Sequence, residues 1–437
     1  MNNLRLLTGL LTAVLSGGGA YTYGRTAMSL EDIFAAAEAN SVQLRPALTS
    51  QTEAEREISV ARAGRLPDIS TSLSLSYIGD GFTTKRDFSD YMRAPIPHLG
   101  NGLSVTVTQP VYTGGAVSSA IDMAELKSTA ARYAAELRRD DIRLRLTGYY
   151  LDLYRYASLR RVVDANIAAA QKVLREMRAR HAQGTALRND ITRYELLVSN
   201  LGLQLVRIDN TLDILNTDLV TTAGLPEGTV VEPDSTLPDR ALPRDDAEWW
   251  QGEAQAHSPA LGMAQTGVDI SRKAEALVRS ERLPKIGVQA GWTIDGPILV
   301  EIPPVNRNLS YWYVGVNVSY NLSSLYKSNR KLARSRTATR RAAEEHEAAR
   351  EELRLAVNAD HVRYIEAYEE VKTQQKSVEL AEQNYRTAAT RYAAGIALVT
   401  DMLDAANAKL EAEQQLVNSR INIIYYYYKL LFDTGKI

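Results

Sequence analysis

The densest group of side chains that could bind a metal or move a proton is the run Glu344, Glu345, His346 and Glu347. Neighbouring residues on a helix point to different faces, so this run indicates a solvated helix surface rather than one converging site. The chain has no cysteine, and its five histidines lack the spacing of metal ligands. It also lacks the G-x-S-x-G, H-E-x-x-H, P-loop and dinucleotide-binding motifs. We therefore expect no metal, no cofactor and no enzymatic activity.

The charge balance narrows the class of partner. The 437 residues include 51 basic and 52 acidic side chains, for a net charge of −1. This balance gives no electrostatic reason to expect nucleic acid as a partner. The 23 tyrosines far outnumber the 4 phenylalanines, and aromatic rings with a polar tip suit surfaces that are part apolar and part wet.

The first residues resemble a secretory signal peptide over 1–20. Arg5 supplies a positive charge, Leu6–Leu15 is apolar, and Gly18-Gly19-Ala20 offers small residues for cleavage. The apolar stretch is shorter than the ~20 residues of a transmembrane helix. A buried N-terminal helix is the alternative, and we expect export.

Two sets of residues recur along the chain, which indicates an internal duplication. Arg65-Leu66-Pro67 returns as Arg282-Leu283-Pro284. At one constant shift, Arg180, Gly184, Ala186, Leu187 and Asp190 return as Arg391, Gly395, Ala397, Leu398 and Asp401. A repeat of this length is half a protein rather than a short solenoid unit. We expect a first repeat over 21–224, a Pro-rich linker over 225–244 and a second repeat over 245–437.

Each repeat contains two stretches that alternate in polarity with period two. They are Ile69–Tyr77, Leu103–Gln109, Ile286–Ile294 and Trp312–Tyr320, which predict β-hairpins at about 69–112 and about 286–322. One face is apolar and the other is rich in Ser, Thr and Gly, as in transmembrane β-strands. A half-buried sheet of a soluble protein also alternates. The signal peptide and the aromatic residues Trp312 and Tyr320 near strand ends favour the membrane.

A helix opens each repeat, the first with a break expected near Pro46, and a long helical tract follows each β-hairpin. Ser29 and Asp32 occupy capping-box positions, and Asp245 is expected to cap a helix that runs to Arg282. The long tracts lack proline, and in the first one apolar residues recur about every 3.5 residues, the coiled-coil period. Gly184 and Gly395 are the expected helix C-caps. We therefore expect helical hairpins over about 115–223 and about 326–432, with tips near 184 and 395.

Four membrane strands cannot close a barrel alone. An open sheet edge in lipid leaves backbone groups without hydrogen bonds, so several protomers must share one barrel. Two copies would give eight strands, whose interior is filled by side chains, whereas three would give twelve and leave room for water. The Ser, Thr and Gly face favours three or more protomers.

Several motifs resemble the TolC-like outer-membrane efflux proteins, also called outer membrane factors. The segment Gln109–Gly115 looks like the strand-exit motif of that family, the segment Arg391–Ala405 looks like its hairpin tip, and the two Arg-Leu-Pro motifs fit as well. The resemblance implies a mixed α and β fold that is mostly helical. Four transmembrane β-strands per protomer would form a shared trimeric 12-stranded barrel, and long coiled-coil helical hairpins would form a periplasmic α-barrel.

The resemblance also implies a function. It implies the outer-membrane channel of a tripartite efflux or type I secretion system, a passive trimeric duct from a pump–adaptor complex to the exterior. The implied partners are two further copies in a homotrimer, a periplasmic adaptor (membrane fusion) protein, an inner-membrane pump and outer-membrane lipid. The implied location is the outer membrane, with a periplasmic helical extension. An exported coiled-coil structural or adaptor protein without a pore is the alternative, but it leaves the strands unexplained.

Residues of the two hairpin tips receive roles from the resemblance. The expected pore constriction consists of Asp401, Asp404 and Asp190, because rings of carboxylates attract cations. Asp401 is an equal candidate for the N-cap of its helix. The residues expected to contact the adaptor are Arg180, Gly184, Leu187, Arg391, Tyr392, Gly395 and Leu398.

The chain departs from the family at two tip positions. Some members hold the closed tip with an arginine where this chain has Ala397, and the first-repeat equivalent of Asp404 is Arg193. Arg193 or Arg188 is therefore a candidate to pair with Asp401 or Asp190.

Overall fold

The computed structural model describes residues 25–234, 236–237, 240–301 and 304–437. The signal peptide expected over 1–20 lies outside these residues. The chain divides into two compact units. The first comprises the described part of Met1–Gln43 with Ile142–Arg244 and Val362–Lys429, and the second comprises Leu44–Asp141, Asp245–His361 and Leu430–Ile437. None of the described helices combines the length and apolarity needed to cross a bilayer.

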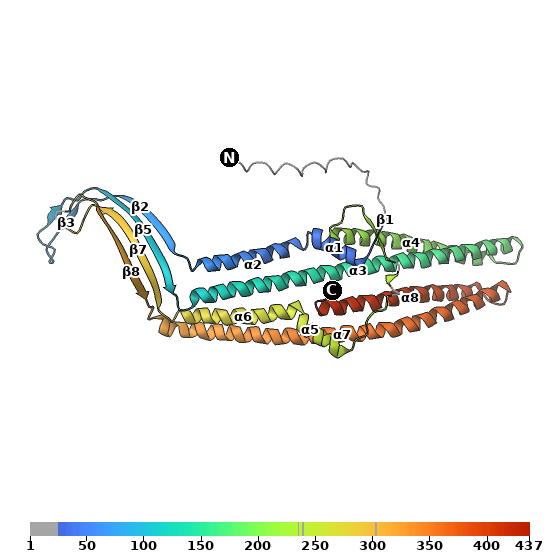
Figure 1. The fold of residues 1–437 in the computed structure, drawn as a ribbon. Helices are drawn as coiled ribbons and strands as arrows, with labels where there is room; N and C mark the ends of the chain where they lie inside the picture. Colours follow the sequence, from blue (N-terminus) through green and yellow to red (C-terminus); the bar gives the residue numbers. More distant parts are fainter. Residues whose placement is uncertain (1–24, 235, 238–239, 302–303) are drawn as a thin grey trace, which may run out of the picture. The chain divides into compact units, whose positions relative to one another are not determined.

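The second unit contains an antiparallel four-stranded sheet in the order β2-β5-β7-β8 (Figure 1). Its strands are β2 (Asp68–Tyr77), β5 (Leu99–Tyr112), β7 (Lys285–Gly296) and β8 (Leu309–Ser319). Thr71, Val105, Trp292 and Trp312 lie in one row across the sheet. The register therefore brings the largely apolar alternate positions of all four strands to one face.

The opposite face of this sheet differs from the expected run of small polar residues. Ser72 and Ser104 pair there with their hydroxyl oxygens 2.8 Å apart. The same face of β8, however, carries Tyr311 and Tyr313. A Cβ added to Gly291 would lie 2.6 Å from the Tyr313 ring, so this glycine leaves the space that the ring occupies. The loop between β2 and β5 contains a small hairpin that was not expected, β3 (Gly81–Thr83) with β4 (Met92–Ala94).

The helix expected from Asp245 to Arg282 is two helices, so that prediction was wrong. They are α5 (Ala247–His257) and α6 (Pro259–Ser280). Pro259 has no N–H and disfavours a helical conformation at the residue before it, so α5 cannot continue through it. The N-cap is Asp246 rather than Asp245, and its carboxylate accepts the Trp249 N–H at 2.8 Å. In the first repeat, α2 (Arg45–Ala63) also begins beside a proline.

Two long helical hairpins form the framework of the first unit. They are α3 (Ala116–Ala182) with α4 (Arg188–Ala223), and α7 (Ser324–Ala393) with α8 (Val399–Asp433) (Figure 1). Only the parts of α3 from Ile142 and of α7 from Val362 belong to this unit, and α8 belongs to it up to Lys429. Apolar side chains of both hairpins share a buried core, which includes Val163, Met177, Ile191, Tyr194 and Met402.

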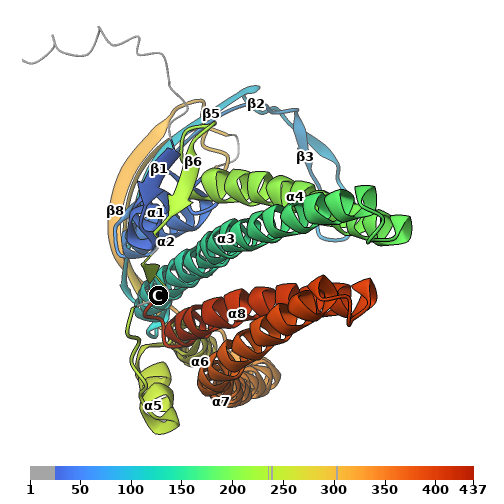
Figure 2. The ribbon, with the colours of Figure 1, turned by 90° about the vertical axis from the view of Figure 1, so that its right-hand side faces the viewer.

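A parallel pair of strands, not expected from the sequence, completes the first unit. β1 (Arg25–Met28) pairs with β6 (Val230–Pro233), which lies within the expected irregular linker (Figure 2). The Tyr150 hydroxyl donates to the Met28 carbonyl at 2.8 Å and accepts the Asp234 N–H at 2.8 Å. α1 (Leu30–Asn40) follows β1, and its predicted capping box between Ser29 and Asp32 is confirmed.

Candidate functional site at the hairpin tips

The same backbone motif closes both hairpin tips. α3 ends at Ala182 before Gly184 with φ +75, and α7 ends at Ala393 before Gly395 with φ +73. The Thr185 N–H donates to the Arg180 carbonyl at 2.9 Å, and the Ile396 N–H donates to the Arg391 carbonyl at 2.9 Å. These are Schellman caps, with glycine in the left-handed position. The predicted capping role of both glycines is confirmed.

Asp401 supports the start of the returning helix, but it is not the N-cap. α8 begins at Val399, so Asp401 is its third residue. Its carboxylate accepts the Leu398 N–H at 3.2 Å. A carboxylate at this position satisfies a free backbone donor and complements the positive end of the helix dipole. The N-cap reading was therefore wrong by three positions, although the carboxylate does cap the helix from within.

Asp190 occupies the matching position of α4 but reaches a different partner. Its carboxylate accepts a hydrogen bond from the Tyr392 hydroxyl at 3.4 Å, across to the second hairpin. Beside it, the Arg180 guanidinium donates to the Ala393 carbonyl at 3.0 Å. Burial, and then the Asp190 charge, raise the pKa of Tyr392, so its phenol stays protonated and can donate. Two contacts therefore tie the first tip to the second within one chain.

Asp404 lies one helical turn beyond Asp401, on the same face of α8. It is exposed, and its carboxylate has no hydrogen-bond or ion-pair partner in the described part of the chain. Within those same residues, Arg188 and Arg193 also make no ion pair. The expected pairing of either arginine with Asp190 or Asp401 is therefore not found among the described residues. The sequence could not show that Asp190 would instead accept from Tyr392.

Apolar side chains at both tips are exposed. Leu187 is 69% exposed and Leu398, its repeat equivalent, is 70% exposed. Ile396 is 78% exposed and was not among the expected site residues. The signal that could have identified it is an apolar residue directly after a capping glycine, where the first repeat has Thr185. Both tips therefore present large apolar side chains to solvent.

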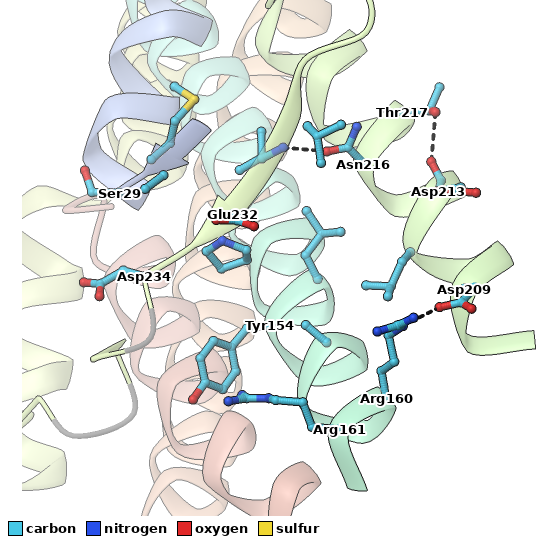
Figure 3. A pocket seen from close by; sticks show the side chains of 18 residues that line it. Ser29, Tyr154, Arg160, Arg161, Asp209, Asp213, Asn216, Thr217, Glu232 and Asp234 are labelled. Carbon is cyan, nitrogen blue, oxygen red and sulfur yellow. Dashed lines mark hydrogen bonds and ion pairs between the residues drawn. The ribbon is translucent and has the colours of Figure 1, made fainter. Parts of the chain in front are cut away.

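Away from the tips, the first unit contains a hollow between β1, β6, α3 and α4, with a volume of about 1090 Å³. Figure 3 shows Arg160 paired with Asp209, at 2.7 Å. Asn216 accepts the Val231 N–H at 2.9 Å and so holds β6 along one wall. Arg160 and Asp209 neutralise each other, whereas the Arg161 guanidinium donates to the Ser158 hydroxyl at 3.0 Å. Among the described residues there is also no acidic or histidine cluster arranged to hold a metal ion.

Comparison with known proteins adds an independent line of observation. The family model described as outer membrane efflux protein matches residues 34–225 and 250–424. The proteases secretion protein PrtF of Dickeya chrysanthemi is 26% identical over 295 residues, which cover 64% of this chain and 60% of that protein. The chain thus matches less than two thirds of that relative's length.

Two further known proteins match most of the chain. The pyoverdine export outer membrane protein OpmQ of Pseudomonas aeruginosa is 22% identical over 418 residues, which cover 90% of this chain and 82% of that protein. The crystal structure of the outer membrane protein VceC from Vibrio cholerae covers 93% of this chain and 96% of its own, with a TM-score of 0.78 and 15% sequence identity. The structural likeness shows a shared fold that is mixed and mostly helical.

Proposed function

Because the chain belongs to the outer membrane efflux protein family, as its motifs predicted, we propose that it is the outer-membrane channel of a tripartite efflux or type I secretion system. In this role it is a passive duct that carries substrate from a pump–adaptor complex to the exterior. It lies in the outer membrane and extends its helices into the periplasm. The observation that carries the proposal is the pair of matched hairpin tips, on a chain that also forms a four-stranded sheet with one largely apolar face.

The strand edges support a barrel shared between three copies. β2 and β8 each have one partner among the described strands, so each leaves an edge open. In lipid such edges must pair, because no water is present to satisfy their N–H and C=O groups. Joining β8 of one copy to β2 of the next would close a trimeric barrel of twelve strands, wide enough for water.

The chain organisation is proposed as two repeats. The first covers 21–224 and the second 245–437, joined by the linker 225–244, and a signal peptide over 1–20 directs export. The matched caps at Gly184 and Gly395, with equivalent hydrogen bonds, support this duplication.

The tips are proposed as the surface for a periplasmic adaptor, which links the duct to an inner-membrane pump. Leu187 and Leu398 offer exposed apolar contacts, and Gly184 and Gly395 shape the turns that present them. The Arg391 guanidinium, which has no partner in the described part of the chain, offers a positive charge. Arg180 and Tyr392 already bond across to the other hairpin, so their part is to hold the two tips together.

Asp404, Asp401 and Asp190 are proposed to line the periplasmic constriction. Asp404 is the strongest candidate of the three, because it is exposed and unpaired in the described chain. Three copies would place three such carboxylates in a ring, which would attract cations and resist anions. Asp401 and Asp190 would contribute while also holding the local structure.

The relatives do not narrow the cargo to one class. One is named for protease secretion and the other for pyoverdine export. A wide aqueous duct carries little chemical specificity, so either a polypeptide or a small molecule is compatible with this chain. The pump and the adaptor then select the cargo.

The test begins with extraction of the mature protein from outer membranes and its insertion into planar bilayers. A channel should need detergent for extraction, migrate as a trimer and give small, cation-selective conductance steps. Detergent extract from cells that lack the gene serves as the control. A protein that stays soluble and monomeric without detergent would instead support the coiled-coil structural or adaptor role.

A further inference from the structure

The two hairpins of one chain contribute different groups to the contacts between their tips. The first hairpin contributes the Arg180 guanidinium and the Asp190 carboxylate, and the second contributes the Ala393 carbonyl and the Tyr392 hydroxyl. The donor–acceptor distances are 3.0 Å and 3.4 Å. Each hairpin therefore presents one half of a complementary pair of groups.

Because of the repeat, the second hairpin carries an arginine and an aspartate equivalent to those of the first, but among the described residues neither forms a hydrogen bond or ion pair with the other hairpin of the same chain. Arg391 and Asp401 of the second hairpin are the equivalents of Arg180 and Asp190. The Arg391 guanidinium has no partner in the described part of the chain, and the only hydrogen bond to the Asp401 carboxylate there comes from its own helix start. In the first hairpin, His181 and Ala182 stand where the second has Tyr392 and Ala393.

We propose that Arg391 and Asp401 of one copy dock on the Ala182 carbonyl and the His181 imidazole of a second copy. This interface rests on the trimer of the proposed function and repeats, between chains, the contacts seen within one. Arg391 donates to the Ala182 carbonyl, and His181 donates from Nε2 to Asp401. His181 Nδ1 lies 2.9 Å from the Ala186 carbonyl, so the doubly protonated ring is the form that makes both bonds.

The packing of the long helices next to the tips supports the same contact between two copies. Within one chain, Asn166 of α3 donates to Glu413 of α8 at 2.9 Å, so these two helices face each other. In the repeat, α7 is equivalent to α3 and α4 is equivalent to α8. The corresponding contact between chains would therefore join α7 of one copy to α4 of the next.

These two helices carry exposed apolar residues in the first unit. On α4 they are Leu196, Leu203, Val206 and Ile214, with exposed fractions of 61%, 52%, 55% and 62%. On α7 they are Val362, Ile365 and Leu380, with exposed fractions of 56%, 41% and 53%. A second copy laid along both faces would bury these side chains, which explains apolar surface that a solitary chain would leave in water.

Because the chain has no cysteine, engineered pairs can report each contact separately. Ala179→Cys with Ala393→Cys tests the contact within a chain, and Ala182→Cys with Thr390→Cys tests the proposed contact between chains. Ala179 and Thr390 directly precede Arg180 and Arg391, so both pairs keep the two guanidinium groups. Detergent-solubilised protein is treated with a short bismaleimide and run on a denaturing gel. The first pair should give a cross-linked monomer identified by peptide mass, and the second should give covalent dimers and trimers. The four single variants should give no cross-link between these positions.

The possible results distinguish a failure of the proposed interface from a failure of the proposed channel function. If protein carrying the second pair is trimeric and conducts ions, but cross-links only within chains or not at all, the interface is overturned and the channel stands. If the protein is a monomer without conductance, the channel fails first. As a second variant, Arg391→Ala should raise the open fraction in planar bilayers severalfold while the cross-link between positions 179 and 393 still forms. An unchanged open fraction would also overturn the interface.

Discussion

The Tyr392 hydroxyl donates to the Asp190 carboxylate at 3.4 Å and joins the end of α7 to the start of α4, 202 positions away in sequence. The contact lies beside the tip, where the neighbouring Ala397 cannot supply a charged latch. Separation of the two hairpins would break this bond and the one from Arg180 to Ala393. The pair therefore joins the two hairpin tips of one chain.

Tyr392→Phe should loosen the tip, because it removes the hydroxyl and keeps the ring in its packed position. A net loss of about 1 kcal/mol is expected for such a hydrogen bond, or roughly a fivefold rise in the open fraction. Single-channel recording in planar bilayers measures it. Tyr385→Phe is the matched control, since Tyr385 packs on the same core and its hydroxyl has no partner in the described chain. Equal effects of the two variants would contradict the latch.

The same bond predicts a pH dependence. Burial and the Asp190 charge raise the pKa of Tyr392 above its ordinary value. A raised pKa means that the contribution of the bond is fully present below about pH 10 and is lost as the pH rises through the pKa of the folded state. The open fraction should therefore show no Tyr392-dependent change at neutral pH and should rise in the strongly alkaline range. Tyr392→Phe should lack that alkaline rise, and a rise of the same size in this variant would assign it to another group.

Gly395→Val should distort the second tip, because a β-branched residue is strained at a φ of +73 although no atom lies within 4 Å of its Cβ. The expected cost is about 1–2 kcal/mol. Gly395→Asn is the control, since asparagine tolerates this conformation. The valine variant should lower adaptor binding, measured with purified adaptor, and leave trimer assembly intact. Loss of the trimer would argue that the tip serves assembly instead.

Asp404→Ala combined with Asp401→Ala should weaken cation selectivity. Three copies would lose six carboxylates from the proposed constriction, and the electrostatic preference of a pore depends on such rings. Reversal potentials under a salt gradient measure the change. Glu379→Ala is the control, because Glu379 is exposed and already paired with Lys376 at 2.8 Å. Selectivity that stays at the level of the unmodified channel would remove these aspartates from the constriction.

Tyr150→Phe should destabilise the first unit by about 1–3 kcal/mol, because it leaves the Met28 carbonyl and the Asp234 N–H without their shared partner. Thermal unfolding followed by circular dichroism measures the shift. Tyr154→Phe is the control, since Tyr154 lines the hollow and its hydroxyl has no partner among the described residues. A shift no larger than that of the control would show that water replaces the lost bonds.

Signals local to a few residues were enough to predict much of the fold. Alternation over Ile69–Tyr77 predicted β2, and the capping box at Ser29 depends on contacts within one helical turn. Gly184 and Gly395 were predicted as caps because a left-handed φ favours glycine wherever it occurs. The break at Pro259 was equally local and was missed, although proline itself was the signal.

The sequence by itself determined the family, the strands and the position of both tips, because repeated motifs and periodicity are properties of neighbouring residues. Only the tertiary structure decided which groups meet across the chain. The pairing of β1 with β6 and the choice of Tyr392 as the partner of Asp190 join residues far apart in sequence. Asp190 and Asp401 occupy equivalent positions, yet one bonds to the other hairpin and one to its own helix. The packing of the second hairpin against the first makes that difference, and no local pattern contains it.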